Sequence, residues 1–256
     1  MLKRLLLLLS LLAIATGVGW KYRPQLIQWW RTASVSLEPG KKPVPDPKAY
    51  AVMVSELERW RSDLATRHRA ARTNAERQSI ERETRSLLET ALPAMMRCWL
   101  GTPWDFHGTA KGPGQGKIAC GYFVATVLQD AGFKVDRYKL AQQPSGNILR
   151  SFLPKKACTL TVGQEYNTFA TGVEKLDPGI YVVGLDTHVA FIVVRDDSTF
   201  RFIHSSGSRP WCVVDESRAE AAVLQRSNWR MLGNLTASPA VLRRWLNAEK
   251  IPVHGT

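Results

Sequence analysis

Three residues that lie far apart in the sequence, Cys120, His188 and His204, are of the types that perform nucleophilic catalysis by a thiol. Cys120 stands in the first turn of a predicted helix over residues 120–131, and Gly132 is placed to end that helix. The helix dipole and the free N–H groups of a first helical turn stabilise a thiolate over a thiol. We therefore expect Cys120 to be a nucleophile.

A thiol nucleophile needs a base, and the base needs a group that holds it. His188 opens a predicted strand in LDTHVAFIVV, and His204 ends the next strand in RFIHSS. Adjacent antiparallel strands would bring the two imidazoles side by side. The chain order Cys, His, His is consistent with a thiol triad in which His188 is the base and His204 orients it.

Each of these residues also has a purely structural interpretation. A free cysteine packs like a small apolar side chain, and histidines at strand ends need no catalytic role. A zinc site built from Cys120, His107, His188 and His204 would have suitable ligand types, but the short ligand-pair spacing of structural zinc sites is missing. We therefore expect no metal and no cofactor.

Composition and charge narrow the class of protein. The chain has 256 residues, 45% of them hydrophobic, with nine tryptophans, which excludes collagen-like and wholly disordered proteins. Its formal net charge of +13 favours an anionic partner, such as nucleic acid, acidic lipid or an acidic wall polymer. Because no nucleic-acid recognition motif is present, we expect anionic envelope polymers and no nucleic acid.

The first twenty residues predict export. Two cations precede an uncharged, mostly apolar run over residues 5–20, and Ala13-Ile14-Ala15 offers a cleavage site. The cations and tryptophans behind this run resemble instead an interfacial anchor that stays uncleaved. Either alternative places the body outside the cytoplasm, periplasmic or secreted, with a possible membrane contact through this segment. A disulfide between Cys158 and Cys212 is permitted there but does not follow from the sequence.

The remaining chain divides by its composition and periodicity. We expect a signal peptide or membrane anchor over 1–20, a linker over 21–47, a helical extension over 48–93, the domain with the candidate site over 94–215, and a helical tail over 216–256. Thr73 with Glu76 is a possible capping box, so we expect the extension to be two helices or one long bent helix. Strands are predicted over 180–183, 188–194 and 199–204, and the long segment over 144–172 is expected to rim or cover the cleft.

Several ordered motifs carry a family resemblance. LGTPWDFHGTAKGPGQGKIACGYFVATVLQDAGF resembles the entry motif of NlpC-type cell-wall cysteine peptidases, in which a Gly-Thr-Pro-Tyr loop leads to Asp-Cys-Ser-Gly-Phe-Val. LDPGIYVV, THVAFIVV and RFIHSSG resemble the strands that follow in that family. The resemblance implies an α+β, papain-like fold with helices packed on an antiparallel sheet, preceded here by the helical extension. It also implies Cys120 as nucleophile, His188 as base and His204 as the orienting residue.

The chain also departs from that family. Ala119, Gly121 and Trp104 stand where many members have Asp, Ser and Tyr, the groups thought to hold the free amino end of a stem peptide. Their loss removes the polar groups that would bind an ammonium group. The residues expected to contact substrate in this chain are Trp104, Asp105, His107, Gly121 and Tyr122.

Residues and resemblance together favour an exported cysteine hydrolase that cleaves amide bonds in peptidoglycan stem peptides or cross-bridges. One alternative is a catalytically silent module on the same fold that binds a wall peptide or a partner protein. Another is a thiol acyltransferase or deamidase that uses the same nucleophile.

Overall fold

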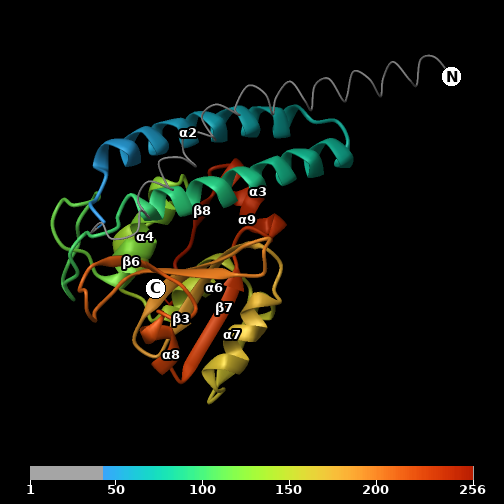
Figure 1. Ribbon diagram of the computed structural model, residues 1–256. Helices are drawn as coiled ribbons and strands as arrows, with labels where there is room; N and C mark the ends of the chain where they lie inside the picture. Colours follow the sequence, from blue (N-terminus) through green and yellow to red (C-terminus); the bar gives the residue numbers. More distant parts are fainter. Residues whose placement is uncertain (1–42, 256) are drawn as a thin grey trace.

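A six-stranded antiparallel sheet with helices on both faces forms the body of the protein, in a computed structural model that describes residues 43–255 (Figure 1). The strand order is β2-β7-β3-β4-β5-β6. This is an α+β architecture, as predicted. The signal or anchor predicted over 1–20, and most of the linker predicted over 21–47, lie outside the described residues. Within residues 43–255, no helix is long and apolar enough to cross a membrane.

The elements of the described chain are as follows. The helices are α2 (Pro47–Ala70), α3 (Asn74–Arg97), α4 (Cys120–Asp130), α5 (Arg137–Ala141), α6 (Ser145–Phe152), α7 (Tyr166–Glu174), α8 (Ala222–Arg226) and α9 (Pro239–Leu246), with a short 3-10 helix at Lys155–Ala157. The sheet contains β2 (Cys158–Val162), β3 (Gly179–Leu185), β4 (Val189–Val194), β5 (Phe200–Ser205), β6 (Val213–Glu216) and β7 (Trp229–Asn234). A separate parallel pair joins β1 (Lys134–Val135) to β8 (Lys250–Ile251).

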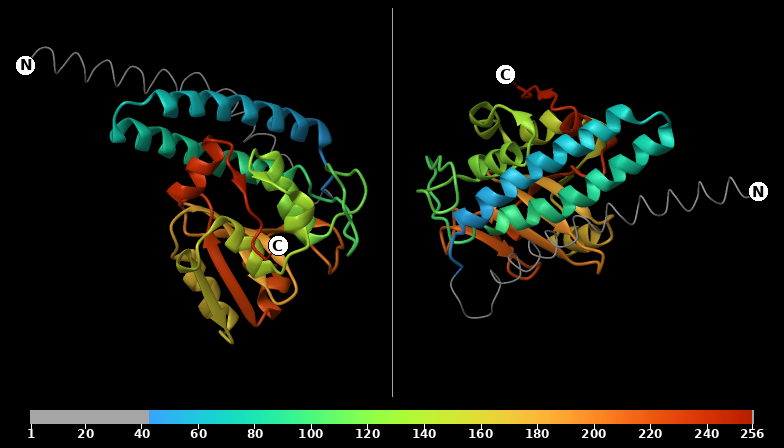
Figure 2. Two further views of the ribbon diagram at one scale, coloured as in Figure 1. Left: turned by 180° about the vertical axis from the view of Figure 1, so that it is seen from behind. Right: turned by 90° about the horizontal axis from the view of Figure 1, so that it is seen from above.

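The helical extension is an antiparallel hairpin of α2 and α3, which run side by side across the molecule (Figure 2). Asp46 caps α2, since its side chain accepts the N–H of Ala49, and Pro47 occupies the first helical position. Thr73 and Glu76 form both bonds of the predicted capping box at the start of α3. The two helices and the turn between them are therefore confirmed.

The boundary predicted between the helical extension and the next domain falls inside a helix. Helix α3 passes through Pro93 and ends at Arg97, so it crosses the boundary expected at residue 93. A proline inside a helix removes one backbone hydrogen bond. Here the surrounding turns bury Leu88, Leu92 and Met95 completely, and this packing offsets the lost bond.

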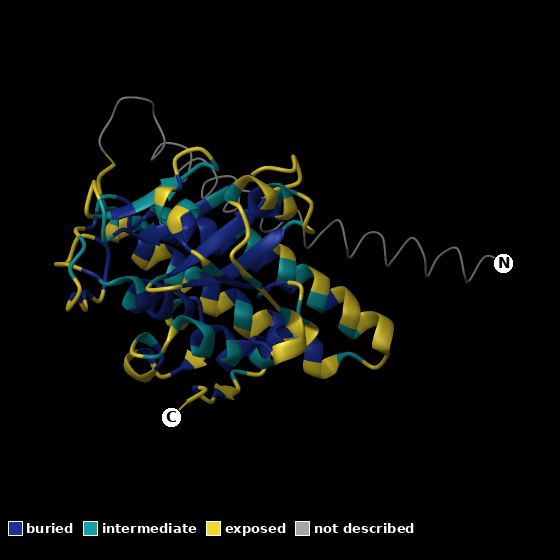
Figure 3. Cartoon of the chain, turned by 90° about the horizontal axis from the view of Figure 1, so that it is seen from below, coloured by how far each residue is buried: buried dark blue, intermediate teal, exposed yellow. Residues whose placement is uncertain are grey.

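The hairpin shares its core with the sheet. Trp99, the second residue after α3, packs edge-on against Tyr50 of α2 and Phe123 of α4, with ring centroids 5.6 and 6.0 Å apart. Phe123 in turn packs against Phe191 of β4. Figure 3 shows buried strands at the centre and an exposed distal end of the hairpin. The extension is therefore part of the hydrophobic core and not an appended module.

The tail predicted to be helical over 216–256 is helical only in part. Strand β7 lies inside the sheet, between β2 and β3, whereas α8 and α9 are helical as expected. A buried arginine, Arg230, obscured the strand pattern. Its guanidinium donates to the carbonyl oxygens of Leu224, Gln164 and Gln225, so each of its three nitrogens has a partner in the interior.

We predict that Leu88→Ala in α3 lowers the free energy of unfolding of the whole protein by about 2–5 kcal/mol, because the side chain is fully buried in the shared core. Urea unfolding followed by circular dichroism measures this. Val52→Ala is the control, since Val52 is 58% exposed on α2, and a change within about 0.5 kcal/mol is expected. A separate early transition for the hairpin would contradict the shared core.

Candidate active site

The loop before α4 sets the position of Cys120. Ser205, at the end of β5, donates its hydroxyl to the carbonyl oxygen of Ile118 at 2.7 Å, and the N–H of Ala119 donates to Gly108 at 2.9 Å. Ala119 is the N-cap of α4 and supplies no side-chain cap. The first N–H groups of α4 are therefore left for the sulfur of Cys120 and for a ligand.

A buried arginine fixes the same loop from the other side. The guanidinium of Arg137 donates to Thr126 in α4 at 2.5 Å and to the carbonyl oxygen of Ala110 in the loop at 2.7 Å. It also stacks over the rings of Tyr122 and Tyr138, at 5.0 and 5.1 Å from their centroids. The loop and the start of α4 are thus held as one unit.

The start of α4 does not make the Cys120 thiol more acidic than an ordinary one. Burial raises the pKa of the Cys120 thiol, although the N–H groups of Val189, Gly121 and Cys120 itself lower it in part. The prediction that the helix terminus stabilises a thiolate at Cys120 is wrong. The loss of water around the sulfur raises its pKa by more than the hydrogen bonds from the N–H groups lower it. An attack by this sulfur requires its proton to be removed in the same step.

The two predicted catalytic histidines are joined by a hydrogen bond. The Nε2 atom of His188 lies 2.8 Å from Nδ1 of His204, and the rings are nearly perpendicular, with centroids 4.8 Å apart. His188 directly precedes β4, and His204 lies in the neighbouring strand β5, so the predicted strand pairing is confirmed. The Nδ1 atom of His188 makes no hydrogen bond among the described residues.

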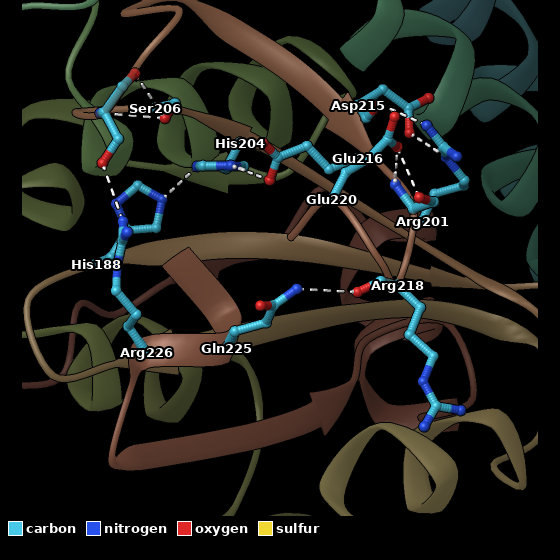
Figure 4. Close-up of polar contacts among 12 residues, drawn as sticks. His188, Arg201, His204, Ser206, Asp215, Glu216, Arg218, Glu220, Gln225 and Arg226 are labelled. Atoms are coloured by element: carbon cyan, nitrogen blue, oxygen red, sulfur yellow. Dashed lines mark hydrogen bonds and ion pairs between the residues drawn. The ribbon is translucent and has the colours of Figure 1, made fainter. Parts of the chain in front are cut away.

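A carboxylate that the sequence analysis missed completes this row. Oε2 of Glu216 lies 3.1 Å from Nε2 of His204 (Figure 4). In the register of β5 and β6, Glu216 is opposite Phe202, and Phe202 and His204 share one face of the sheet, as residues two apart in a strand do. Glu216 is the last residue of β6 and the first residue of the predicted helical tail, and no motif marked it.

Burial shifts the pKa of every group in the row. It lowers the pKa of His204 to about 3, and together with the neighbouring His204 it lowers the pKa of His188 well below its usual value. Burial also raises the pKa of Glu216 to about 7, and the carboxylates of Glu220 and Asp215 add to this. Both rings are therefore neutral near pH 7, where Glu216 titrates.

Cys120 and His188 line the same cleft, which has a volume of about 690 Å³. Of the long segment over 144–172 that was expected to rim or cover the cleft, only residues 144–148 and Arg150, at the start of helix α6, line it. Helix α4 packs on one face of the sheet through Phe123, whereas His204 lies with Phe202 on the other. Cys120 and His188 both line the cleft where β4 begins, and no hydrogen bond joins them among the described residues.

Of the five residues expected to contact substrate, only Gly121 lines this cleft. Trp104 packs against Trp211 instead, with ring centroids 5.5 Å apart, and Asp105 forms an ion pair with Lys117 at 3.2 Å. Asp105 and His107 line a separate, shallower pocket. The hydroxyl of Tyr122 accepts a hydrogen bond from Gln142 outside the cleft lining. Their contact with substrate stays a prediction.

Gly121 has a packing reason to be glycine. A Cβ atom at this position would lie 2.3 Å from the carbonyl oxygen of Ala141, at the end of α5. The family's serine at this position would therefore displace α5. The close approach of α5 to α4 explains one of the departures from the NlpC pattern.

The cysteines and the candidate metal ligands do not form a cluster of the kind that binds a metal ion. All four cysteines are free thiols, so the permitted bridge between Cys158 and Cys212 is absent from this structure. Within residues 43–255, no group of three or more His, Cys, Asp or Glu side chains is arranged to hold a metal ion.

Comparisons with protein-family models, with curated proteins and with solved structures gave no match. The chemistry of the site therefore has to be argued from its own geometry.

We predict that Gly121→Ala lowers the free energy of unfolding by roughly 1–3 kcal/mol, because the new methyl group overlaps the carbonyl of Ala141. Thermal and urea unfolding measure the change. Gly172→Ala in α7 is the matched control, since a Cβ there meets nothing within 4 Å and alanine favours a helix by roughly 0.5–1 kcal/mol. Equal effects of the two variants would show that α5 does not restrict the first turn of α4.

Proposed function

We propose that the protein is an exported cysteine hydrolase of NlpC type, with a papain-like fold, that cleaves amide bonds in peptidoglycan stem peptides or cross-bridges. The observation that carries the proposal is that Cys120 and His188 line one cleft while the far nitrogen of His188 is held by His204. A nucleophile, a base and an orienting group then occur in the order that the motifs imply.

The chemistry follows from these positions. The sulfur of Cys120 attacks the amide carbonyl carbon as its proton passes to Nδ1 of His188, and the N–H of Cys120 helps to hold the oxyanion. His188 then protonates the leaving amine, the C–N bond breaks, and a thioester remains on Cys120. Water attacks the thioester with its proton passing to His188, which releases the acid and restores the thiol. Substrate closes the contact between sulfur and ring, since catalytic hydrogen bonds tighten in the Michaelis complex.

The charges of the cleft support an acidic peptide as substrate. Arg150 of α6 lines the cleft and makes no hydrogen bond or ion pair among the described residues. The carboxylate of Asp186, which lines the same cleft, already accepts hydrogen bonds from the hydroxyl of Ser227 and the N–H groups of Asn228 and Trp229. The cleft therefore offers a free cation to the carboxylates of stem peptides and no free anion to an ammonium group.

A second candidate is a catalytically silent module that binds wall peptide or a partner protein. The raised pKa of Cys120 and the missing hydrogen bond between its thiol and His188 favour it. A thiol acyltransferase or deamidase would share the acylation step with the hydrolase. Product analysis on a defined muropeptide separates these three activities.

We predict that Cys120→Ser abolishes amide hydrolysis of a defined muropeptide, because the hydroxyl is a far weaker nucleophile than the thiol at this site. Mass spectrometry of the products measures the loss. Cys158→Ser is the matched control, since Cys158 lies in the edge strand β2 and does not line the cleft, and its activity should be unchanged. Full activity of the Cys120 variant, with both variants folded, would remove the proposed mechanism.

A further inference from the structure

The row of His188, His204 and Glu216 has two possible arrangements of its protons. Each ring is neutral and carries one N–H, and each of the two hydrogen bonds in the row, at 2.8 and 3.1 Å, needs one donor and one acceptor. His204 is fully buried, so neither of its nitrogens can turn to water instead. The state of the carboxyl group at one end therefore sets the proton position at the other.

An ionised Glu216 accepts only. Nε2 of His204 must then carry the proton and donate it to the carboxylate, which leaves Nδ1 of His204 as an acceptor. Nε2 of His188 donates to that acceptor, and Nδ1 of His188 keeps its lone pair. This is the nitrogen that has no other partner, and it is the one that a base needs.

A Glu216 that is protonated on Oε2, the oxygen that faces His204, reverses the row. Its hydroxyl donates to Nε2 of His204, so Nδ1 of His204 carries the proton and donates to Nε2 of His188. The proton of His188 then sits on Nδ1, where no lone pair is left for the thiol proton. Both arrangements keep every hydrogen bond, but only the first contains a base.

We infer that Glu216 is a positioning residue that selects the base tautomer of His188, so that the site works only while this carboxylate is ionised. Its effect on catalysis rests on the proposed function, whereas the tautomer selection does not. The carboxyl group touches neither the cleft nor Cys120, and it acts through His204 alone.

The charges around Glu216 place its titration near neutral pH. Glu220, from the turn before α8, and Asp215, its neighbour in β6, disfavour the anion, whereas Arg201 of β5 and Arg226 of α8 favour it. Burial is the largest effect, and the pKa of Glu216 is raised to about 7, while that of His204 is lowered to about 3. As the pH falls, Glu216 therefore takes up a proton before His204 does.

Nitrogen-15 NMR of the full chain with labelled histidine tests the selection without any substrate. The expected result is that the proton of His188 sits on Nε2 above neutral pH and moves to Nδ1 as the pH falls through about 7. In Glu216→Gln the side chain cannot titrate, so the tautomer of His188 should not change between about pH 5.5 and 8.5. A pH-independent tautomer in the wild type, or an unchanged switch in the variant, would overturn the inference.

Variants of two residues near Glu216 test the inference even if the Glu216→Gln protein does not fold. Glu220→Gln removes a carboxylate that disfavours the anion, so the midpoint of the switch should move to lower pH. Arg226→Gln removes a cation that favours the anion, so the midpoint should move to higher pH. If both variants switch tautomer at the same pH as the wild type, Glu216 is not the titrating group and the inference fails.

Muropeptide hydrolysis over the same pH range separates this inference from the proposed function. For an active hydrolase, the acid limb of kcat should coincide with the tautomer midpoint and shift with it in the Glu220 and Arg226 variants. If kcat of Glu216→Gln no longer falls at acid pH, the inference is supported, whatever the maximal kcat of that variant. If the protein is inactive but the tautomer of His188 still switches, the proposed hydrolase activity is wrong and the role of Glu216 stands. If the protein is active but the acid limb of kcat does not shift in the variants, the hydrolase stands and the role of Glu216 is wrong.

Discussion

The site depends on a fully buried imidazole with a partner at each nitrogen. An unpaired polar atom inside a protein costs about 1–3 kcal/mol, so His204 holds His188 on one side and Glu216 on the other. Three adjacent strand segments must keep their register for both bonds to form, because a slip of one residue would turn His204 to the opposite face. The geometry of the base is thus set by the sheet rather than by the cleft.

The N-terminal hairpin contributes to that register from a distance. Asp215, the neighbour of Glu216, is almost fully buried and receives Arg97 from α3 at 2.8 Å and Arg201 from β5 at 2.7 Å. Buried pairs of this kind specify an arrangement more than they add stability. Since α3 also shares the hydrophobic core, the hairpin ties the edge strand β6 to the body, and with it the carboxylate that reaches His204 (Figure 4).

The sequence predicted the parts of the fold whose signals are local. The capping box at Thr73, the helix that starts at Cys120 and the strands around His188 and His204 all carry patterns of caps, periodicity or β-branched residues. Strand β7 could not be found this way, because Arg230 looks exposed in a sequence, whereas in the fold it is buried and donates to the carbonyl oxygens of Leu224 and Gln225 nearby and of the distant Gln164. Glu216 was missed for a similar reason, since its meaning comes from pairing with β5. The expectation of a thiolate failed because burial is a property of the folded chain and not of the helix start.

The central claim is that His188, at the start of β4, is the base that takes the proton of the Cys120 thiol. Alkylation of each cysteine by iodoacetamide, followed by peptide mass spectrometry in the wild type and in His188→Gln, tests it most directly. The account predicts that loss of the ring slows labelling of Cys120 at least about tenfold, since general-base assistance is typically worth more than this, while Cys158 is labelled at an unchanged rate. Equal labelling of Cys120 with and without His188 would contradict the account, because it would show that the thiol and the imidazole are chemically independent.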